Sequence, residues 1–232
     1  MKVFSSLYCE TLKVIRSMVF WLSFVFFAVS LIILSFGIEP RNWSAFLNSF
    51  LVLAANMGMI VNFFIASWVF GREFADKTNK DLIAKPMSRT TVVLSKFILV
   101  FTWGIVFTIF LFVLSLAVGF LLGFTGFSAA LLLEALPKFI VTSLLYIVIS
   151  TPGAFFSSIS KGILAPIGIL FIIAIAANIL NNTGAAIYFP WTIPNIFRET
   201  GHLSPASTAI LIFTGISGII GTFAWWRFAQ QE

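Results

Sequence analysis

Few side chains of this 232-residue chain are of a type that performs acid–base or nucleophilic chemistry. His202 is the only histidine and Cys9 the only cysteine, so the sequence lacks the ligand set of a zinc site and the partners of a catalytic dyad or triad. Glu199 lies three residues before His202, but an isolated pair of this kind in a loop is ordinarily solvated surface. We therefore expect neither an enzyme nor a bound metal or cofactor.

One segment looks superficially like a phosphate-binding loop. Residues 71–78 read GREFADKT, whereas the P-loop has a second glycine directly before its lysine so that backbone amides can wrap the phosphates. Asp76 holds that position here, and an apolar run precedes the segment where a P-loop has a strand. We predict that this segment does not bind ATP.

The elements that position these residues have the composition of membrane helices. Hydrophobic residues make up 60% of the chain, charged residues only 9%, and the mean hydropathy is +1.07, whereas a soluble domain has about 25% charged residues. Six runs contain no Asp, Glu, Lys, Arg or His, and a helix needs about 20 residues to cross a bilayer. The runs are 18–37, 46–70, 97–124, 139–158, 163–180 and 208–226. This pattern predicts an all-α integral membrane protein whose single transmembrane domain, residues 1–232, contains six transmembrane helices.

The distribution of basic residues predicts the orientation. With the N-terminus in the cytoplasm, eleven of the 14 Lys and Arg residues fall in cytoplasmic segments and three, Arg41, Lys138 and Arg198, in outer ones. The cytoplasmic set is Lys2, Lys13, Arg16, Arg72, Lys77, Lys80, Lys85, Arg89, Lys96, Lys161 and Arg227. The positive-inside rule then places both termini in the cytoplasm. Because the net charge of +6 follows this pattern, it does not indicate nucleic-acid binding.

Two segments outside the runs have their own patterns. Residues 1–17 alternate apolar and polar residues at helical spacing, which predicts an amphipathic helix in the membrane interface with its basic residues near lipid headgroups. A plain extension of the first span is the alternative. The outer loop 181–207 is rich in aromatic residues and proline. It is either a broken, re-entrant structure or an ordinary aromatic belt at the interface, and its composition favours neither.

The stretch 71–96 is the only substantial polar segment, with six basic and three acidic residues in 26 positions. A helix can continue from Glu73, and Pro86 would end it because proline cannot donate the backbone hydrogen bond. Ser88 or Thr90 can then cap a new helix that leads into the third span. The pattern predicts a short helix along the cytoplasmic membrane face between spans two and three, placed to dock on a cytosolic partner.

At these residues the chain resembles the membrane subunits, or permeases, of ABC type-2 transporters, in particular the bacitracin-resistance and bacteriocin-immunity exporters. The matching residues are Glu73, Lys77-Thr78, Leu82, Ala84, Pro86, Ser88-Arg89 and Ser95-Lys96. Segments 188–194 (YFPWTIP) and 225–231 (WWRFAQQ) agree as well. Lys77 and Asn79 depart from the pattern, because many members have glycine and an apolar residue there. These departures bear on which partner binds rather than on the class.

The resemblance implies a half-transporter in a prokaryotic cell membrane. Two copies, or this chain and a related permease, would form the path, and a cytosolic ATP-binding cassette ATPase would supply energy to export a hydrophobic or amphipathic peptide antibiotic, lipid or drug. Residues 71–96 would form the coupling helix and residues 1–17 an interfacial elbow helix. Candidate coupling residues are Glu73, Lys77, Thr78, Leu82, Pro86, Ser88 and Arg89, and candidate path residues are Asn56, Asn62 and Asn178.

Two readings from other classes stay open at this point. The chain could be a membrane scaffold or assembly factor that moves nothing and anchors a cytosolic partner through residues 71–96. It could also be an intramembrane enzyme acting on a lipid, although only the acids of segment 71–96 would then be available for chemistry. Composition alone would explain residues 71–96 as a basic segment that only fixes the orientation of the chain in the membrane. The order of the matching residues in this segment favours coupling to a cytosolic ATPase.

Overall fold

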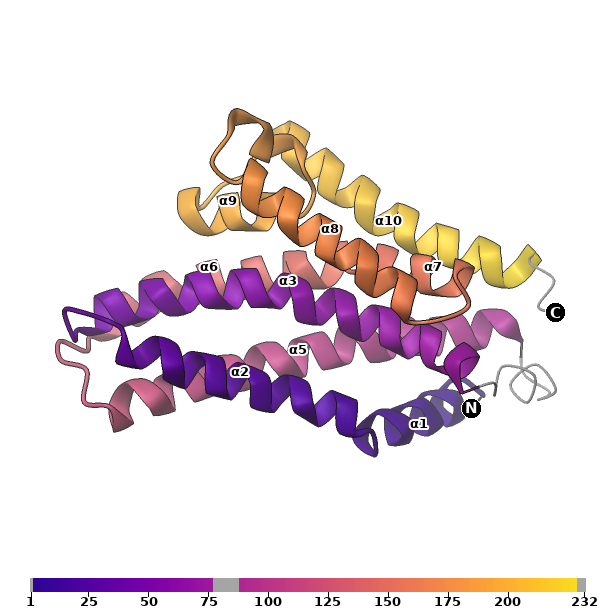
Figure 1. Cartoon of the computed structure of the whole chain (residues 1–232), viewed down its shortest axis with the longest axis horizontal. Coiled ribbons are helices and arrows are strands. Elements are labelled where there is room, and N and C mark those ends of the chain that lie inside the picture. Colours follow the sequence, from indigo (N-terminus) through magenta and orange to yellow (C-terminus); the bar gives the residue numbers. More distant parts are fainter. Residues whose placement is uncertain (1, 77–87, 229–232) are drawn as a thin grey trace.

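The computed structural model describes residues 2–76 and 88–228, and these residues form helices joined by loops (Figure 1). In chain order the elements are α1 (Lys2–Ile15), α2 (Met18–Phe36), α3 (Trp43–Ala75), α5 (Arg89–Leu121), α6 (Ala129–Ile149), α7 (Thr151–Ile159), α8 (Leu164–Leu180), the 3-10 helix η1 (Gly184–Tyr188), α9 (Ile193–Thr200) and α10 (Pro205–Phe228). The all-helical class predicted from the sequence is thus found.

The long helices alternate in direction along one bundle. α2, α3, α5, the α6–α7 pair, α8 and α10 run back and forth, so that α1 and the end of α10 lie at the same end of the molecule (Figure 1). We call this the basic end, because Lys13, Arg72, Arg89, Lys161 and Arg227 belong to the helix ends and turns gathered there. The even number of traverses agrees with termini on one side.

Five elements are long and apolar enough to cross a membrane: α2, α3, α5, the α6–α7 unit and α10. The sixth predicted span is the shorter α8, whose 17 residues reach only about 25 Å at 1.5 Å per residue. A hydrocarbon core is about 30 Å thick. Five helices thus have the length and composition for a membrane crossing, and α8 lies at the lower limit of length.

Side-chain caps fix where several helices begin. The Asn42 side chain accepts a hydrogen bond from Ala45 N at 2.8 Å at the start of α3, and Ser88 Oγ accepts one from Thr91 N at 3.1 Å at the start of α5. Such caps satisfy backbone N–H groups that have no partner within the helix. Of the two caps that the sequence allowed for the helix entering span three, the structure selects Ser88.

The predicted span 139–158 is interrupted between α6 and α7. Pro152 cannot donate a backbone hydrogen bond to the carbonyl of Val148, so the regular helix ladder is broken there. The hydroxyl of Thr151 lies 3.1 Å from the Val148 carbonyl oxygen and 2.8 Å from that of Gly215 in α10. The carbonyl group that the break leaves without its backbone donor is therefore hydrogen-bonded by Thr151, which also links the break to α10.

The central helix is α3. In its most apolar stretch 61% of the residues are buried, against 22% for α2 and 28% for α10. It packs against α2, α5, α6, α7 and α8, and its side chains Phe46, Phe50, Phe63 and Phe70 are fully enclosed. A helix surrounded by the others in this way can transmit a movement at one end of the bundle to the rest.

Candidate functional site

The segment predicted as a coupling loop is shorter than 71–96. Residues up to Ala75 continue α3, and α5 already begins at Arg89. Each of these helices has 33 residues, about 50 Å, so both extend well beyond a hydrocarbon core. Of the predicted coupling residues, Lys77, Thr78, Leu82 and Pro86 lie outside the described residues. Glu73, Ser88 and Arg89 lie at the helix ends that flank them.

Four charged side chains from three helices meet at the basic end. Lys13 Nζ of α1 lies 2.6 Å from Glu10 Oε1 and 3.0 Å from Glu73 Oε1 of α3. Lys96 Nζ of α5 lies 3.3 Å from Glu10 Oε2 and 3.2 Å from Glu73 Oε2. Each ammonium group thus bridges both carboxylates. We call Glu10, Lys13, Glu73 and Lys96 the charge cluster; it joins α1, α3 and α5.

The charge cluster is buried and electrically neutral. Lys96 is fully buried, and the side chains of Glu10 and Glu73 are only 5% and 3% exposed. Lys96 also donates to the Val69 carbonyl at 2.8 Å. The contact between Lys96 and Glu73 Oε2 lacks hydrogen-bond geometry and is purely electrostatic. Buried charges persist only when paired in this way, because an unpaired one carries its full desolvation cost.

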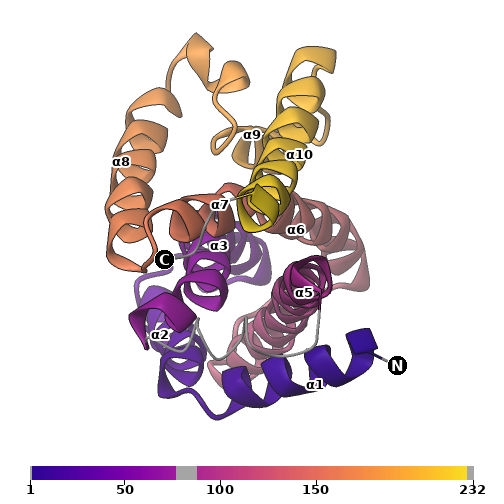
Figure 2. The ribbon, with the colours of Figure 1, turned by 90° about the vertical axis from the view of Figure 1, so that its right-hand side faces the viewer.

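The charge cluster determines how α1 lies. The helix predicted for residues 1–17 is present and runs across the basic end (Figure 2). Its polar side faces the protein, where Ser6 and Glu10 are buried, while Phe4 and Tyr8 are 77% and 67% exposed. The expectation that its basic residues face headgroups is wrong for Lys13, because Glu73 and Glu10 draw that ammonium inward.

The attachment of α1 has a defined pH dependence. Burial opposes ionisation of Glu10, but the ammonium groups of Lys96 and Lys13 outweigh it and hold the pKa of Glu10 below its usual value. Burial likewise opposes the charge on Lys13, but the carboxylates of Glu73 and Glu10 raise the pKa of Lys13. Because the pKa of Glu10 is lowered, its carboxylate stabilises docked α1 at pH values above the carboxyl pKa of the unfolded chain, and this stabilisation is lost as pH falls through the lowered pKa. Because the pKa of Lys13 is raised, its ammonium group stabilises docked α1 below the lysine pKa of the unfolded chain, and this stabilisation is lost as pH rises through the raised pKa.

A spin label on Cys9, which is exposed on α1, tests this dependence. We expect constant, restricted label motion across the neutral range and a mobile label only in acid, once pH has fallen through the lowered pKa of Glu10. A Glu10→Gln variant is the control and should show a mobile label at neutral pH as well. Label motion that is identical in the variant and in the wild type at neutral pH would show that the charge cluster does not hold α1.

A second link at the basic end joins α5 to α10. The guanidinium of Arg89 donates to the Trp226 carbonyl at 3.4 Å. The buried indole of Trp226 donates to Ser158 Oγ of α7 at 3.0 Å and lies against Phe74 of α3. Both helices that flank residues 77–87 are therefore anchored to their neighbours, α3 through the charge cluster and α5 through the cluster and Arg89.

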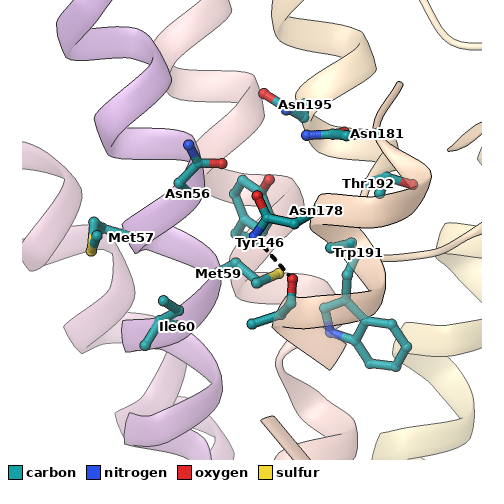
Figure 3. Close-up of a pocket in the computed structure, with 12 residues that line it drawn as sticks. Asn56, Met57, Met59, Ile60, Tyr146, Asn178, Asn181, Trp191, Thr192 and Asn195 are labelled. Carbon is teal, nitrogen blue, oxygen red and sulfur yellow. Dashed lines mark hydrogen bonds between the residues drawn. The ribbon is translucent and has the colours of Figure 1, made fainter. Parts of the chain in front are cut away.

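The amide side chains predicted to line a path divide into two sets. Asn56 of α3 and Asn178 of α8 lie in one pocket of about 250 Å³, together with Asn181 and with Asn195 of α9 (Figure 3). We call this the amide pocket. Asn62 lies elsewhere: it is buried, donates to the Gly58 carbonyl at 2.8 Å and faces Gly104 of α5.

The segment 181–207, predicted as an outer loop, folds back onto the bundle. Its helix α9 packs against α3 and α6, and Arg198 of α9 is buried, donating to Asn195 Oδ1 at 2.8 Å and to Glu199 Oε1 at 2.6 Å. The loop is thus a broken structure, and Glu199 pairs with Arg198. His202 contacts only the backbone and hydroxyl of Thr200. Within the ranges 2–76 and 88–228 no three His, Cys, Asp or Glu side chains gather as a metal site would require.

The basic end joins several helices through side-chain contacts. The helices α3 and α5 flank residues 77–87. Ion pairs join both of them to α1, Arg89 joins α5 to α10, and Trp226 joins α10 to α7. A force applied to the intervening segment would therefore move several helices as bodies, which is how packed helices transmit conformational change.

Comparison with known proteins agrees with this architecture. Residues 6–177 match the family described as ABC-2 family transporter protein. The chain is also 29% identical over 157 residues to the bacitracin transport permease protein BCRB of Bacillus licheniformis, covering 63% of this chain and 76% of that protein. The matched residues run from within α1 to within α8 and contain the whole of α2, α3, α5, α6 and α7. The chain, which has five helices long and apolar enough to cross a membrane, belongs to the ABC-2 family of transporter proteins.

Proposed function

We propose that the chain is the membrane subunit of an exporter driven by a separate ATP-binding cassette ATPase. One observation carries the proposal: the ends of α3 and α5 that flank residues 77–87 are tied by buried ion pairs to α1. An ATPase docked on residues 77–87 would pull on both helices at once, and the permease family supports such a partner. Export, rather than import, rests on the resemblance to bacitracin-resistance exporters, and the relative in Bacillus licheniformis is named as a bacitracin transport permease.

The arrangement in the membrane follows from the same observations. We propose that the basic end faces the cytoplasm, because the positive-inside rule places Lys and Arg there. In that orientation α8 completes a sixth crossing in spite of its 17 residues, since a bilayer thins locally around a short helix. A second copy, or a related permease, pairs with this chain, and the transported molecule is an amphipathic peptide of the bacitracin kind.

The ATPase is the sharpest test of the class. Purified chain in lipid nanodiscs is mixed with a candidate ATP-binding cassette protein from the same organism, and ATP hydrolysis and bacitracin transport are measured. We expect a stable complex, hydrolysis that rises with bacitracin, and transport only with both proteins present. A chain that transports bacitracin alone, or that forms a stable complex without any ATPase, would overturn the proposal and favour a scaffold.

The Arg89→Ala variant tests coupling within that complex. Because Arg89 joins the start of α5 to the end of α10, we expect ATP hydrolysis to continue while transport falls by about tenfold, the size expected when an interaction of about 1.4 kcal/mol in the moving state is lost. Arg41→Ala at the opposite end is the control and should transport as wild type. Equal transport by both variants would remove Arg89 from the coupling path.

A further inference from the structure

We propose that the amide pocket binds the backbone amide groups of the exported peptide; this inference rests on the proposed function and names the substrate contact within it. Four asparagines from three regions of the chain line the pocket (Figure 3). Asn56 comes from α3, Asn178 and Asn181 from the end of α8, and Asn195 from the folded-back helix α9.

The pocket is too polar for a surface in contact with lipid. The side chains of Asn56, Asn178 and Asn181 are all exposed, and within the described part of the chain Asn56 and Asn181 make no side-chain hydrogen bond. An amide without a partner in hydrocarbon costs about 4–8 kcal/mol. Polar groups at membrane depth are tolerated where they line a water-filled cavity or meet another polar surface. We infer that water fills the pocket when it is empty.

The chemistry of the lining selects an uncharged ligand. A primary amide offers both a donor and an acceptor, and no acidic or basic side chain lines the pocket. Arg198 lies behind it, with its guanidinium bound to Glu199 and to Asn195 Oδ1. That bond leaves the Asn195 NH₂ group as the donor facing the pocket. A peptide group also carries one donor and one acceptor. Its N–H can donate to the oxygen of an asparagine side chain while its carbonyl accepts from an asparagine NH₂ group.

The apolar part of the wall suits the side chains of an amphipathic peptide. Met57, Met59 and Ile60 of α3 line the pocket beside the amides, and methionine adapts its shape to different partners. The indole Nε1 of Trp191, also in the wall, is buried and has no hydrogen-bond partner among the residues described. The volume of about 250 Å³ is below the roughly 300–1,000 Å³ of whole-ligand sites. The pocket therefore holds part of a molecule.

Cysteine alkylation measures both water access and peptide binding. Cys9 is the only cysteine, so Cys9→Ser gives a background free of thiols. Into it we place Asn56→Cys or Asn178→Cys in the pocket, Asn62→Cys as a matched amide position on α3 away from it, and Ile109→Cys, which is 59% exposed on α5, as a lipid-facing control. Each chain in nanodiscs is treated with a water-soluble maleimide, with and without bacitracin.

Because a thiol reacts as its thiolate, which forms only where water reaches, we expect positions 56 and 178 to react about tenfold faster than 62 and 109. Bacitracin should slow the reaction at 56 and 178 by at least about threefold and leave the controls unchanged, as protection by a bound ligand requires. Equal rates at all four positions would show a dry surface and overturn the proposal. Fast reaction at 56 and 178 without protection by bacitracin would overturn it as well.

The outcome is separable from that of the proposed function. The alkylation assay uses the chain alone, whereas the class is tested by the complex with its ATPase. If bacitracin stimulates ATP hydrolysis equally in wild type and in the Asn56→Ala, Asn178→Ala double variant, the exporter stands and the amide pocket fails. If no ATPase complex forms while bacitracin protects position 56, the binding site stands without the proposed energy source.

Discussion

Replacing Lys96 with methionine is expected to destabilise the folded protein by about 3–5 kcal/mol, the cost of leaving a buried charge without its partner. Lys96 is fully buried and lies within 3.3 Å of Glu10 Oε2 and 3.2 Å of Glu73 Oε2. Without it, two enclosed carboxylates face one half-buried ammonium, Lys13, and the Val69 carbonyl loses its second donor. Methionine has a similar length, so the loss is one of charge rather than of packing.

Thermal unfolding in nanodiscs measures this effect, with a fall in Tm of roughly 6–20 °C expected at 2–4 °C per kcal/mol. Lys138→Met is the matched control, because Lys138 pairs with Glu134 at 3.0 Å on the surface, where such a pair contributes at most about 0.5 kcal/mol. Adding Glu73→Gln to Lys96→Met should recover part of the loss, since it restores neutrality. Equal melting of the Lys96 and Lys138 variants would contradict a stabilising charge cluster.

The positions of the apolar helices could be predicted because a long run without charged residues leaves few alternatives to a helix. Each of the six apolar runs falls within α2, α3, α5, α6–α7, α8 or α10, apart from residues at their ends. The helix ends could not be predicted, since a charged residue ordinarily marks the end of a span. Glu73 and Lys96 lie inside longer helices because each meets its counter-charge. Glu10 and Lys96 are 86 positions apart, and no pattern within one helix reveals such a pair.

The candidate site was predictable to a similar extent. The motif predicted coupling residues between spans two and three, and this stays a prediction. Ser88 caps α5 as one of the two options, but the side chain of Glu73 faces the protein interior rather than a partner surface. Asn56 and Asn178 were predicted to line a path because they are polar residues in apolar runs. Asn195 and Arg198 belong to segment 181–207, whose composition fitted a re-entrant structure and an aromatic belt equally well. Only the packing of α9 against α3 and α6 brings them together. Loop placement depends on tertiary contacts that local composition does not encode.

A large effect is expected from adding a single methyl group at Gly218 in α10. A Cβ atom there would lie 2.5 Å from Pro152 N and 2.6 Å from Thr151 C, which are backbone atoms at the start of α7. A flexible side chain could rotate away, but these atoms cannot, because Thr151 is held to the Gly215 carbonyl by its hydroxyl. We expect Gly218→Ala to cost about 3 kcal/mol, the upper part of the range for overpacking a well-packed interior.

Replacing a glycine of α8, Gly168, with alanine should instead stabilise the folded protein. A Cβ atom at Gly168 would meet nothing within 4 Å, so Gly168→Ala should stabilise by about 0.5–1 kcal/mol, the helix preference of alanine over glycine. Thermal unfolding of the two variants distinguishes the steric effect at the contact between α10 and α7 from the helix propensity of alanine. If both variants melt alike, α7 and α10 are not in the close contact described. Because α10 also supplies the carbonyl that Arg89 contacts, Gly218→Ala should in addition lower transport in the ATPase complex, whereas Gly168→Ala should not.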